Sequence, residues 1–363
     1  DGLWNMPNLY DIIDRLEKNQ CLEKEEFIFL LDNLTASLAQ YTFEKARKAA
    51  HENFGNRIYI RGLIEISNYC KNDCLYCGIR KSNRKAERYR LNRTDILNCC
   101  NTGYQLGFRT FVLQGGEDIF FDDKILVELI SRIKQSCPDC AVTLSLGERS
   151  RNSYQCLFDA GADRYLLRHE TADENHYSSL HPKEQTLEKR KACLQDLQEI
   201  GYQTGTGFMV GSPRQTHENL AKDLLFIKEL SPAMIGIGPF IPHHDTPFSG
   251  KPQGSLEKTL FLLALLRLMI PNVLLPSTTA LGTIHPEGRE LGILAGANVI
   301  MPNLSPVEVR EKYLLYDNKL SSGEESAEGL SSLRKQMAAM GYEIVIDRGD
   351  YVPQLKKGVL LDV

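Results

Sequence analysis

Three cysteines stand close together in the segment NYCKNDCLYCGIRKSN at 68–83: Cys70, Cys74 and Cys77. Thiolates are soft metal ligands, and these spacings let one short loop present each sulfur atom to a different metal ion. A structural zinc site requires a fourth protein ligand, usually from a second paired motif, and the sequence shows no such pair nearby. The loop therefore indicates a metal cluster with three protein ligands.

Three thiolates on a [4Fe–4S] cluster leave one iron atom without a protein ligand. Such an iron can bind and reduce a small molecule, whereas a cluster with four thiolates only passes electrons on. We therefore predict one [4Fe–4S] cluster, ligated by Cys70, Cys74 and Cys77, that acts on a bound molecule. A second pair, Cys137 and Cys140, precedes a predicted strand, and the sequence leaves open whether it binds anything.

The composition excludes several classes of protein. The chain has 363 residues, a net charge of −4 and 42% hydrophobic residues, which is typical of a soluble globular protein. It lacks the basic excess of nucleic-acid-binding proteins and the run of about 20 apolar residues that a membrane span needs. Ten cysteines without a visible signal peptide indicate reduced thiols, so we expect a cytoplasmic protein.

The hydrophobic pattern predicts the elements that position the cysteine loop. Residues 9–53 show helical spacing, and eight short β-rich segments follow, with helical segments at 94–107, 122–136, 186–200, 216–230 and 255–269 between them. The β-rich segments are 57–67, 109–114, 141–146, 164–169, 203–211, 234–240, 272–278 and 297–303. This alternation predicts an α/β fold, a complete (β/α)8 TIM barrel.

We expect three regions: an N-terminal helical extension at 1–56, the barrel at 57–318 and a C-terminal extension at 319–363. The last should contain a helix around 328–340 and an edge strand at 343–347, close the end of the barrel and carry no chemistry. In such a barrel the functional groups lie at the C-terminal ends of the strands, where the cysteine loop also falls.

Two other strand ends carry polar groups. Gly115, Gly116 and Glu117 follow the second strand; glycines permit close approach of a ligand, and a carboxylate can receive an ammonium group. Alone, this segment indicates only a turn. Arg168 and Glu170 end the fourth strand, where unpaired buried charges are costly, so they either pair with each other or bind a ligand.

The C-x3-C-x2-C pattern, with Tyr76 before its last cysteine, resembles the loop of the radical S-adenosylmethionine (SAM) enzymes. The resemblance implies SAM as a second cofactor, bound to the open iron and cleaved to a 5′-deoxyadenosyl radical. It assigns the SAM contacts to Tyr76, Gln114, Gly115, Gly116, Glu117, Ser145, Glu170 and Arg190.

Longer motifs narrow the resemblance: VTLSLGE (142–148), AGADRYLLRHETA (160–172), GIGPFIPHHDTP (236–247) and GANVIMPN (296–303). In this order they resemble the HydE family of [FeFe]-hydrogenase maturases. The resemblance implies attack of the radical on the sulfur of a cysteine in an iron carbonyl cyanide complex, supplied by HydG, with the product passed to HydF. The residues implied at the substrate site are Arg168, Thr143, Met234, Thr278, Thr279, Met301 and Tyr313.

One departure and three alternatives accompany this interpretation. Some HydE proteins hold a peripheral second cluster with three cysteines, but residues 319–332 contain none, so we predict a single cluster. Biotin synthase requires strand cysteines for its sacrificial cluster, and no predicted strand here provides them. A methylornithine synthase would need cavity carboxylates for a diamine. A non-catalytic iron–sulfur scaffold leaves the Gly-Gly-Glu segment and Glu170 without a role.

Overall fold

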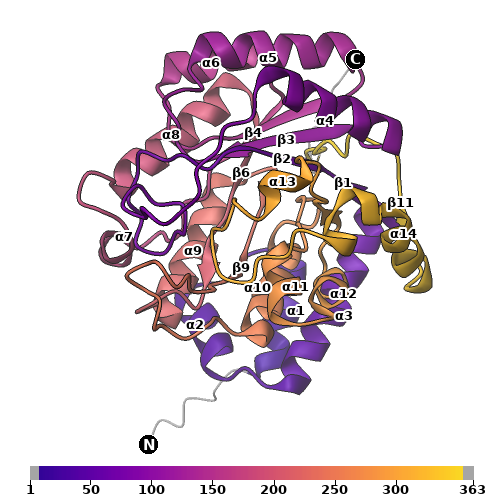
Figure 1. Ribbon diagram of the computed structural model, residues 1–363. Helices are drawn as coiled ribbons and strands as arrows, with labels where there is room; N and C mark the ends of the chain where they lie inside the picture. The colour runs from indigo at the N-terminus through magenta and orange to yellow at the C-terminus, as the bar shows by residue number, and fades with distance from the viewer. Residues whose placement is uncertain (1–7, 355–363) are drawn as a thin grey trace, which may run out of the picture.

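The computed structural model describes residues 8–354. A parallel six-stranded sheet forms its centre, in the order β2-β3-β4-β5-β6-β8, and helices cover its outer side (Figure 1). The six strands are β2 (Gly62–Ser67), β3 (Thr110–Gly115), β4 (Ala141–Ser145), β5 (Arg164–Leu166), β6 (Gln203–Thr206) and β8 (Met234–Ile235). Parallel strands joined by helices confirm the predicted α/β class.

The other strands are short. β1 (Arg57–Ile60) pairs with β10 (Val299–Ile300) and β11 (Glu343–Ile344), and β7 (Met209–Val210) pairs with β9 (Gly238–Pro239). The predicted strand at 272–278 forms no regular strand; Leu274 bridges to Met234, and Pro276 bridges to Val299. Proline has no amide hydrogen to donate to a ladder, which accounts for the interruption.

The five helices predicted between strands are confirmed within one or two residues: α4 (Arg93–Leu106), α5 (Asp123–Ser136), α8 (Leu187–Ile200), α9 (His217–Leu230) and α10 (Leu256–Met269). Each begins after a polar residue whose side chain accepts a hydrogen bond from the backbone N–H three positions later. The shorter helices are α6 (Arg151–Asp159), α7 (Glu174–Leu180), α11 (Thr279–Ile284), α12 (Gly288–Leu294), α13 (Val307–Arg310) and α14 (Leu330–Ala339).

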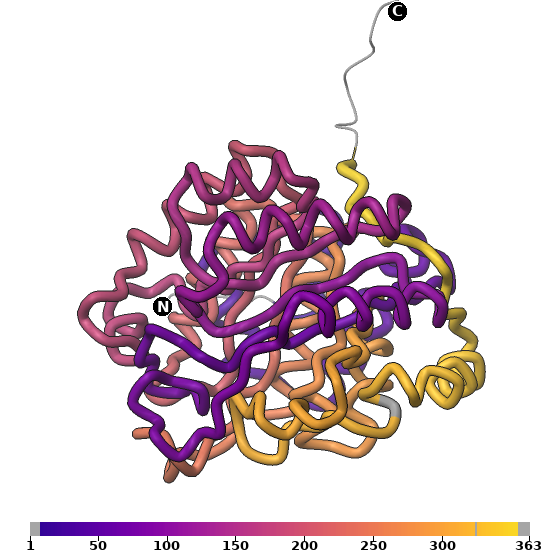
Figure 2. The backbone as a smooth tube through the Cα atoms, turned by 45° about the horizontal axis from the view of Figure 1, so that its top comes forward, coloured from indigo at the N-terminus to yellow at the C-terminus, as the bar shows by residue number. Residues whose placement is uncertain are grey.

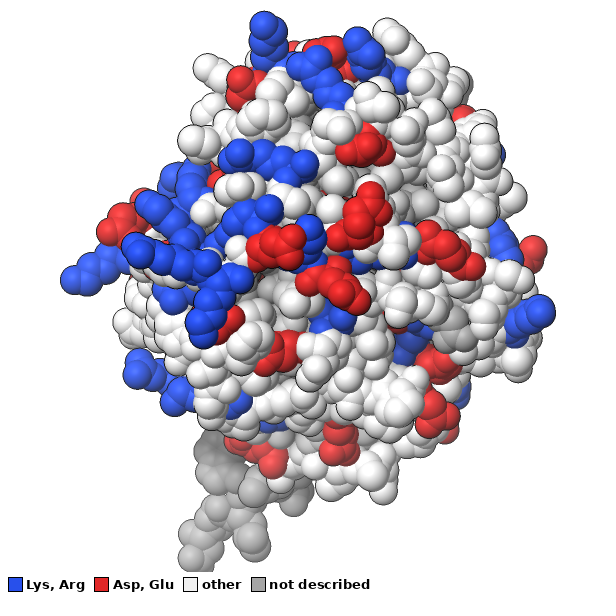
Figure 3. Space-filling model, viewed as in Figure 1, with Lys and Arg blue, Asp and Glu red and all other residues white. Residues whose placement is uncertain are grey.

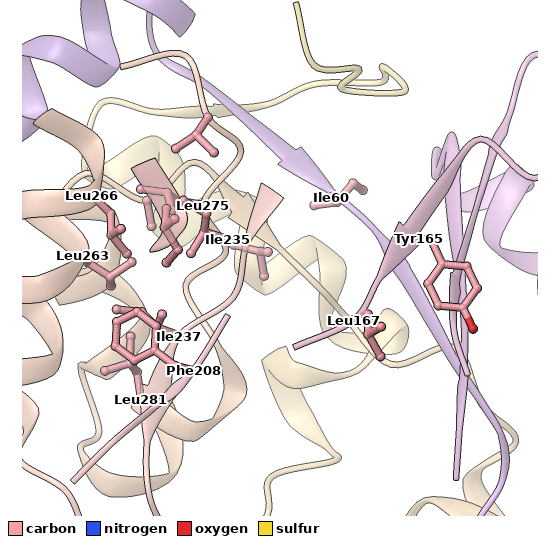
Figure 4. Close-up of a cluster of buried hydrophobic side chains, with 14 of the residues drawn as sticks. Ile60, Tyr165, Leu167, Phe208, Ile235, Ile237, Leu263, Leu266, Leu275 and Leu281 are labelled. Carbon is pink, nitrogen blue, oxygen red and sulfur yellow. The ribbon is translucent and has the colours of Figure 1, made fainter. Parts of the chain in front are cut away.

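The helix α10 is buried over most of its length. Every residue from Thr259 to Met269 is buried, so the helix needs apolar partners on all sides. Figure 4 shows Leu263 and Leu266 of α10 beside Ile235, Ile237 and Leu275, on the outward side of the strands. Burial of each such side chain stabilises the fold by roughly 1.5–3 kcal/mol.

The N-terminal extension supplies the remaining partners of α10. It forms three helices, α1 (Leu9–Asn19), α2 (Lys24–Asp32) and α3 (Ala36–Phe54), which confirms the predicted helical content. α1 and α3 pack on the outer side of α10, and α2 packs on α9 (Figure 1). Among the described residues, no helix is long and apolar enough to span a membrane.

The C-terminal segment covers the N-terminal ends of the strands. After α14 the chain forms β11, as predicted for an edge strand, and then passes beside the sheet (Figure 2). Asp350 Oδ1 accepts hydrogen bonds from Arg164 Nη2 at 2.7 Å and from Gln203 Nε2 at 2.8 Å. Arg164 is fully buried, so Asp350 neutralises a charge that would otherwise be unpaired inside the protein.

We expect Asp350→Ala to lower the free energy of unfolding by about 3 kcal/mol, because the buried Arg164 loses its counter-charge. Burial by itself would raise the pKa of Asp350, but hydrogen bonds from Arg348 and Gln203 and the charge of Arg164 lower it to about 2. A carboxylate with a lowered pKa stabilises the fold above its unfolded pKa of about 3.9. The loss caused by the substitution should therefore shrink as the pH falls from 4 toward 2.

Thermal unfolding of both proteins across this pH range measures the effect. The control is Asp196→Ala, which removes a partner of the exposed Arg151 and should cost at most about 1 kcal/mol. Equal losses from the two substitutions at pH 7 would contradict this account of Asp350.

Candidate functional site

A cavity of about 360 Å³ opens at the C-terminal ends of the strands. Most of the predicted site residues share it, although they come from segments distant in sequence. Those that line it are Tyr76, Cys77, Gln114, Gly115, Ser145, Arg168, Glu170, Arg190, Thr278, Thr279, Met301 and Tyr313. This placement follows the rule that parallel strands gather functional groups at their carboxyl ends.

The cysteine loop is held in place by one arginine that the sequence did not reveal. Arg88 donates hydrogen bonds from its guanidinium group to the backbone carbonyls of Ile79 and Arg80, both at 2.7 Å, and to those of Asn68 and Asn83. Such multidentate contacts restrain the loop on both sides of the cysteines.

Gly116 allows the loops after β2 and β3 to touch. A Cβ atom at this position would lie 2.1 Å from the carbonyl oxygen of Tyr69, so only glycine fits. Gly115 lines the cavity, whereas Gly116 faces the cysteine loop. The neighbouring backbone N–H of Glu117 donates to Cys70 Sγ at 3.4 Å. The glycine pair therefore serves close backbone packing as well as the cavity.

The three thiols fit a polynuclear cluster better than a single metal ion. In the part of the chain that the structure describes, the one group that brings three potential ligand atoms within 4.8 Å of one another is His243, His244 and Asp317. Cys70, Cys74 and Cys77 form no such group, so at least one pair of their sulfur atoms lies more than 4.8 Å apart. Burial raises the pKa of Cys74 to about 12, and burial together with its two neighbours raises that of Cys77. A bound metal must therefore supply the positive charge that keeps these sulfurs deprotonated.

Arg168, His169 and Glu170 alternate at the end of the fourth predicted strand. Arg168 and Glu170 line the cavity, and Arg168 Nε lies 3.4 Å from Glu170 Oε1. The buried atoms Arg168 Nε, Arg168 Nη2 and Glu170 Oε2 have no hydrogen-bond partner among the described residues. These atoms can therefore receive an anion and a cation or hydroxyl group from a ligand.

His169 points away from the cavity and anchors this strand end. Its Nδ1 lies 2.8 Å from Thr206 Oγ1, and its Nε2 lies 3.1 Å from Asp223 Oδ1. Burial lowers the pKa of His169 to about 3, so the imidazole stays neutral and structural. Next to it, Glu170 has a φ of 65°, an uncommon conformation for a residue other than glycine. This strain falls on a cavity residue, as is common at binding sites.

Arg190 lies on the cavity wall with a partner that the sequence did not suggest. Its Nε donates to Glu148 Oε1 at 2.7 Å, and its Nη1 donates to the carbonyl oxygen of Arg168. Burial by itself would lower the pKa of Arg190, but Tyr177 and Glu148 raise it, so the guanidinium group keeps its charge. The cavity therefore holds a fixed positive charge near Cys74 and Glu170.

Several predicted residues lie outside the cavity lining. Thr143 lies two positions before the cavity residue Ser145 on β4, and Met234 of β8 lies two positions before the cavity residue Gly236, which directly follows that strand. Both are buried, so they face the layer below the cavity. The Thr143 hydroxyl is buried there without a hydrogen-bond partner among the described residues. The other predicted residues that do not line the cavity are Cys70, Cys74, Gly116 and Glu117, and they lie in the two loops beside it.

Glu117 already has partners. Its Oε1 accepts from the Glu148 backbone N–H at 2.8 Å, and its Oε2 lies 3.2 Å from Lys71 Nζ. The carboxylate thus joins the loop after β3 to the loop after β4 and to the cysteine loop. In this arrangement Glu117 supports the loops around the cavity without lining the cavity itself.

The structure adds a buried ion pair to the cavity wall. Lys319 Nζ contacts the carboxylate of Glu65, which also accepts a hydrogen bond from Asn303 Nδ2 at 3.1 Å. Glu65 is the one charged residue in β2, a strand that is buried throughout, and this was an available signal in the sequence. Nothing in the sequence indicated Lys319 as its partner, 254 positions away. Lys319, the first residue of the predicted C-terminal extension, therefore contributes to the cavity wall.

Cys137 and Cys140 are buried at the opposite ends of the strands. Among the residues that the structure describes, no third ligand atom completes a metal site with them. Burial raises the pKa of both thiols, that of Cys140 to about 12. The pair is accordingly best described as buried small side chains.

Basic side chains gather on one part of the surface, over the loop between β2 and α4 (Figure 3). Residues 71–93 contain eight Lys and Arg residues. Carboxylates neutralise several of them, as in Arg80–Asp73 and Lys85–Asp245, both at 2.9 Å. The overall charge of −4 therefore conceals an uneven distribution, with positive charge next to the cysteines.

Comparison with known proteins agrees with this geometry. Residues 64–227 match the model of the radical SAM superfamily. The chain is 40% identical to the [FeFe] hydrogenase maturase subunit HydE of Thermotoga maritima, over 91% of this chain and 94% of that protein. It is 29% identical to 3-methylornithine synthase of Methanosarcina acetivorans, over 82% of this chain and 83% of that protein. The crystal structure of methylornithine synthase (PylB) superposes with a TM-score of 0.78, at 25% identity, over 92% and 97% of the two chains.

The fold, the three-cysteine loop and the superfamily match define a radical SAM enzyme. This class works with a [4Fe–4S] cluster and SAM, so a non-catalytic scaffold is not supported. Within it, the chain belongs to the family of the [FeFe] hydrogenase maturase subunit HydE.

Replacement of one cluster cysteine tests the site. We expect Cys74→Ala to reduce bound iron and sulfide after anaerobic reconstitution to near zero, because two thiolates cannot hold the cluster. SAM cleavage should be lost with it. The matched control is Cys156→Ala, an exposed cysteine on α6, which should bind iron like the unaltered protein. A full cluster signal in Cys74→Ala would remove this loop from the site.

Proposed function

We propose that this enzyme takes part in assembly of the [FeFe]-hydrogenase active centre. Its substrate is an iron-bound cysteine carbonyl cyanide complex received from HydG, and its product is a diiron-subsite precursor passed to HydF. When bound, the cluster and SAM would supply a 5′-deoxyadenosyl radical by one-electron cleavage. In the proposed reaction the radical carbon would form a bond to the cysteine sulfur of the substrate, and the iron–sulfur bond would break with one of its electrons left on the iron. Family membership and the chemistry of the cavity support this proposal.

The observation that carries the proposal is the state of Arg168. Two nitrogen atoms of its guanidinium group are buried at the cavity without hydrogen-bond partners in the described residues. The Arg168 side chain is partly exposed and lies beside Glu170, with Nε and Oε1 3.4 Å apart. A guanidinium group with nitrogen atoms free of hydrogen bonds can still bind an anionic ligand, and its fork suits a carboxylate. The cysteine carboxylate of the iron complex provides one. Thr278, Thr279, Met301 and Tyr313 line the same cavity.

The protein groups divide between the cluster, SAM and substrate. We assign Cys70, Cys74 and Cys77 to the iron atoms of one cluster. Glu170 and the Gln114–Gly115 segment would take the ammonium end of SAM, and Arg190 its carboxylate, with Tyr76 and Ser145 beside them. Thr143 and Met234 would contribute from the deeper layer. The free Glu170 Oε2 atom supports a cationic or hydroxyl ligand at that position.

A methylornithine synthase is the second candidate, because that enzyme resembles the chain in sequence and fold. A diamine substrate would need an unpaired carboxylate in the cavity. Two carboxylates line the cavity, Glu65 and Glu170. Lys319 and Asn303 already bind Glu65, and we assign Glu170 to the ammonium end of SAM, so neither is left for a diamine. The cavity therefore favours an anionic substrate over a diamine.

We also propose that the sheet closes into a complete (β/α)8 barrel. Single parallel bridges support closure: Met234 to Leu274, Pro276 to Val299 and Asn303 to Leu63 of β2. A closed barrel would surround the cavity with strand ends on all sides.

We further propose that the enzyme holds a single [4Fe–4S] cluster, because residues 319–332 contain no cysteine that could ligate a second one.

Substitution of Arg168 tests the substrate assignment. Arg168→Ala should keep the cluster and the SAM cleavage that occurs without substrate. It should lower formation of the adenosyl–cysteine product about 100-fold, the equivalent of one or two charge-assisted hydrogen bonds. Mass spectrometry of reactions with the iron complex measures the product.

The control is Arg132→Ala, which removes an exposed arginine from α5 and should leave product formation unchanged. Unaltered product formation in Arg168→Ala would exclude this residue from the substrate site, whatever the outcome for the cluster.

A further inference from the structure

We propose that Gln185 donates a hydrogen bond from its side-chain amide to the sulfur of Cys74 in the cluster-bound enzyme, and that this bond raises the reduction potential of the cluster. The inference rests on the proposed ligation of the cluster by Cys70, Cys74 and Cys77. It assigns Gln185 as a positioning residue, because it would act on the cluster through a ligand.

The structure places the two side chains in contact. The Cys74 thiol donates to Gln185 Oε1, with the sulfur and oxygen atoms 3.3 Å apart. Gln185 is buried, and its Nε2 atom has no hydrogen-bond partner among the described residues. In this orientation the amide oxygen of Gln185 has a hydrogen-bond partner and the amide nitrogen has none. A buried amide nitrogen without a partner is costly.

Cluster binding would change the Cys74 sulfur from a hydrogen-bond donor to a hydrogen-bond acceptor. A ligating cysteine is deprotonated, so Cys74 then has no proton to donate and becomes an acceptor. The amide oxygen of Gln185 would face a negatively charged sulfur. Rotation of the amide by half a turn exchanges its oxygen and nitrogen atoms with almost no change of shape. The Gln185 Nε2 N–H group would then point at the Cys74 thiolate. A hydrogen bond from this N–H group to the sulfur would replace the repulsion between the sulfur and the amide oxygen.

The surrounding chain fixes Gln185 at this place. The connection between α7 and α8 is tied to the cysteine loop by two contacts: the Leu75 backbone N–H donates to the Leu180 carbonyl at 2.9 Å, and Tyr76 Oη lies 3.1 Å from His181 Nε2. The Gln185 backbone N–H donates to the Pro182 carbonyl at 3.0 Å. These contacts hold the amide beside Cys74.

Cys74 differs from Cys70 in this respect. The Cys70 sulfur accepts from a backbone N–H, that of Glu117, which no side-chain substitution removes. The donor at Cys74 is a side chain and can be changed alone. Hydrogen bonds to cluster sulfurs stabilise the reduced, more negative state and raise the potential. Loss of the Gln185 donor should therefore make the cluster harder to reduce.

Two variants test the proposal: Gln185→Leu removes the donor, and Gln185→Glu replaces it with a carboxylate of the same shape that cannot donate. Each protein is reconstituted anaerobically, and its midpoint potential is measured by redox titration with electron paramagnetic resonance, in the absence of SAM. We expect a more negative potential for both variants, with the larger shift for Gln185→Glu. The control is Gln195→Glu, a residue of α8 that hydrogen-bonds to Glu199 on the surface; its potential should not change.

An unchanged potential in variants that carry a full cluster would overturn the role of Gln185 and leave the proposed function intact. If Gln185→Leu fails to hold its cluster, the midpoint potential of the Gln185→Glu variant, which keeps the shape of the side chain, tests the proposal instead. An unaltered protein that takes up no cluster would overturn this inference and the proposed function together.

Discussion

The parallel alignment of the strands is the constraint on which the site depends. Because β2 to β6 all run in one direction, their C-terminal ends lie at one edge of the sheet. The cysteine loop follows β2, Gly115 ends β3 and Glu170 follows β5, so residues about 100 positions apart reach one cavity. Arg88 and Gly116 then set how closely the loops after β2 and β3 approach each other.

The distribution of buried charge separates structural groups from binding groups. Glu148 pairs with Arg190, and Lys319 pairs with Glu65, so these charges cost little in the folded protein. Arg168 and Glu170 instead keep polar atoms without partners among the described residues. Such atoms persist where a ligand satisfies them, which is why the proposed substrate and SAM contacts fall on these two residues.

Sequence reasoning was most successful where chemistry and periodicity are local. The cysteine spacing, the capped helices and most strand positions are encoded within short segments. The structure confirms these helices and the parallel arrangement of the strands, with six of them in one sheet where eight were predicted in a closed barrel. It could not find pairs that form across the fold, such as Lys319 with Glu65 or Gln185 with Cys74, because no local pattern links such positions. It also could not assign strand layers, so Thr143 and Met234 lie deeper than the cavity wall.

The central claim is that this radical SAM enzyme acts on an iron-bound cysteine. The most direct measurement uses the unaltered protein with a reconstituted and reduced cluster, together with SAM, under anaerobic conditions. Parallel reactions receive either the iron carbonyl cyanide cysteine complex or lysine, and mass spectrometry identifies the adenosyl products and amino acids formed. The account predicts an adenosyl–cysteine adduct with the iron complex and no methylornithine with lysine. Methylornithine formed from lysine, without an adduct from the iron complex, would contradict it.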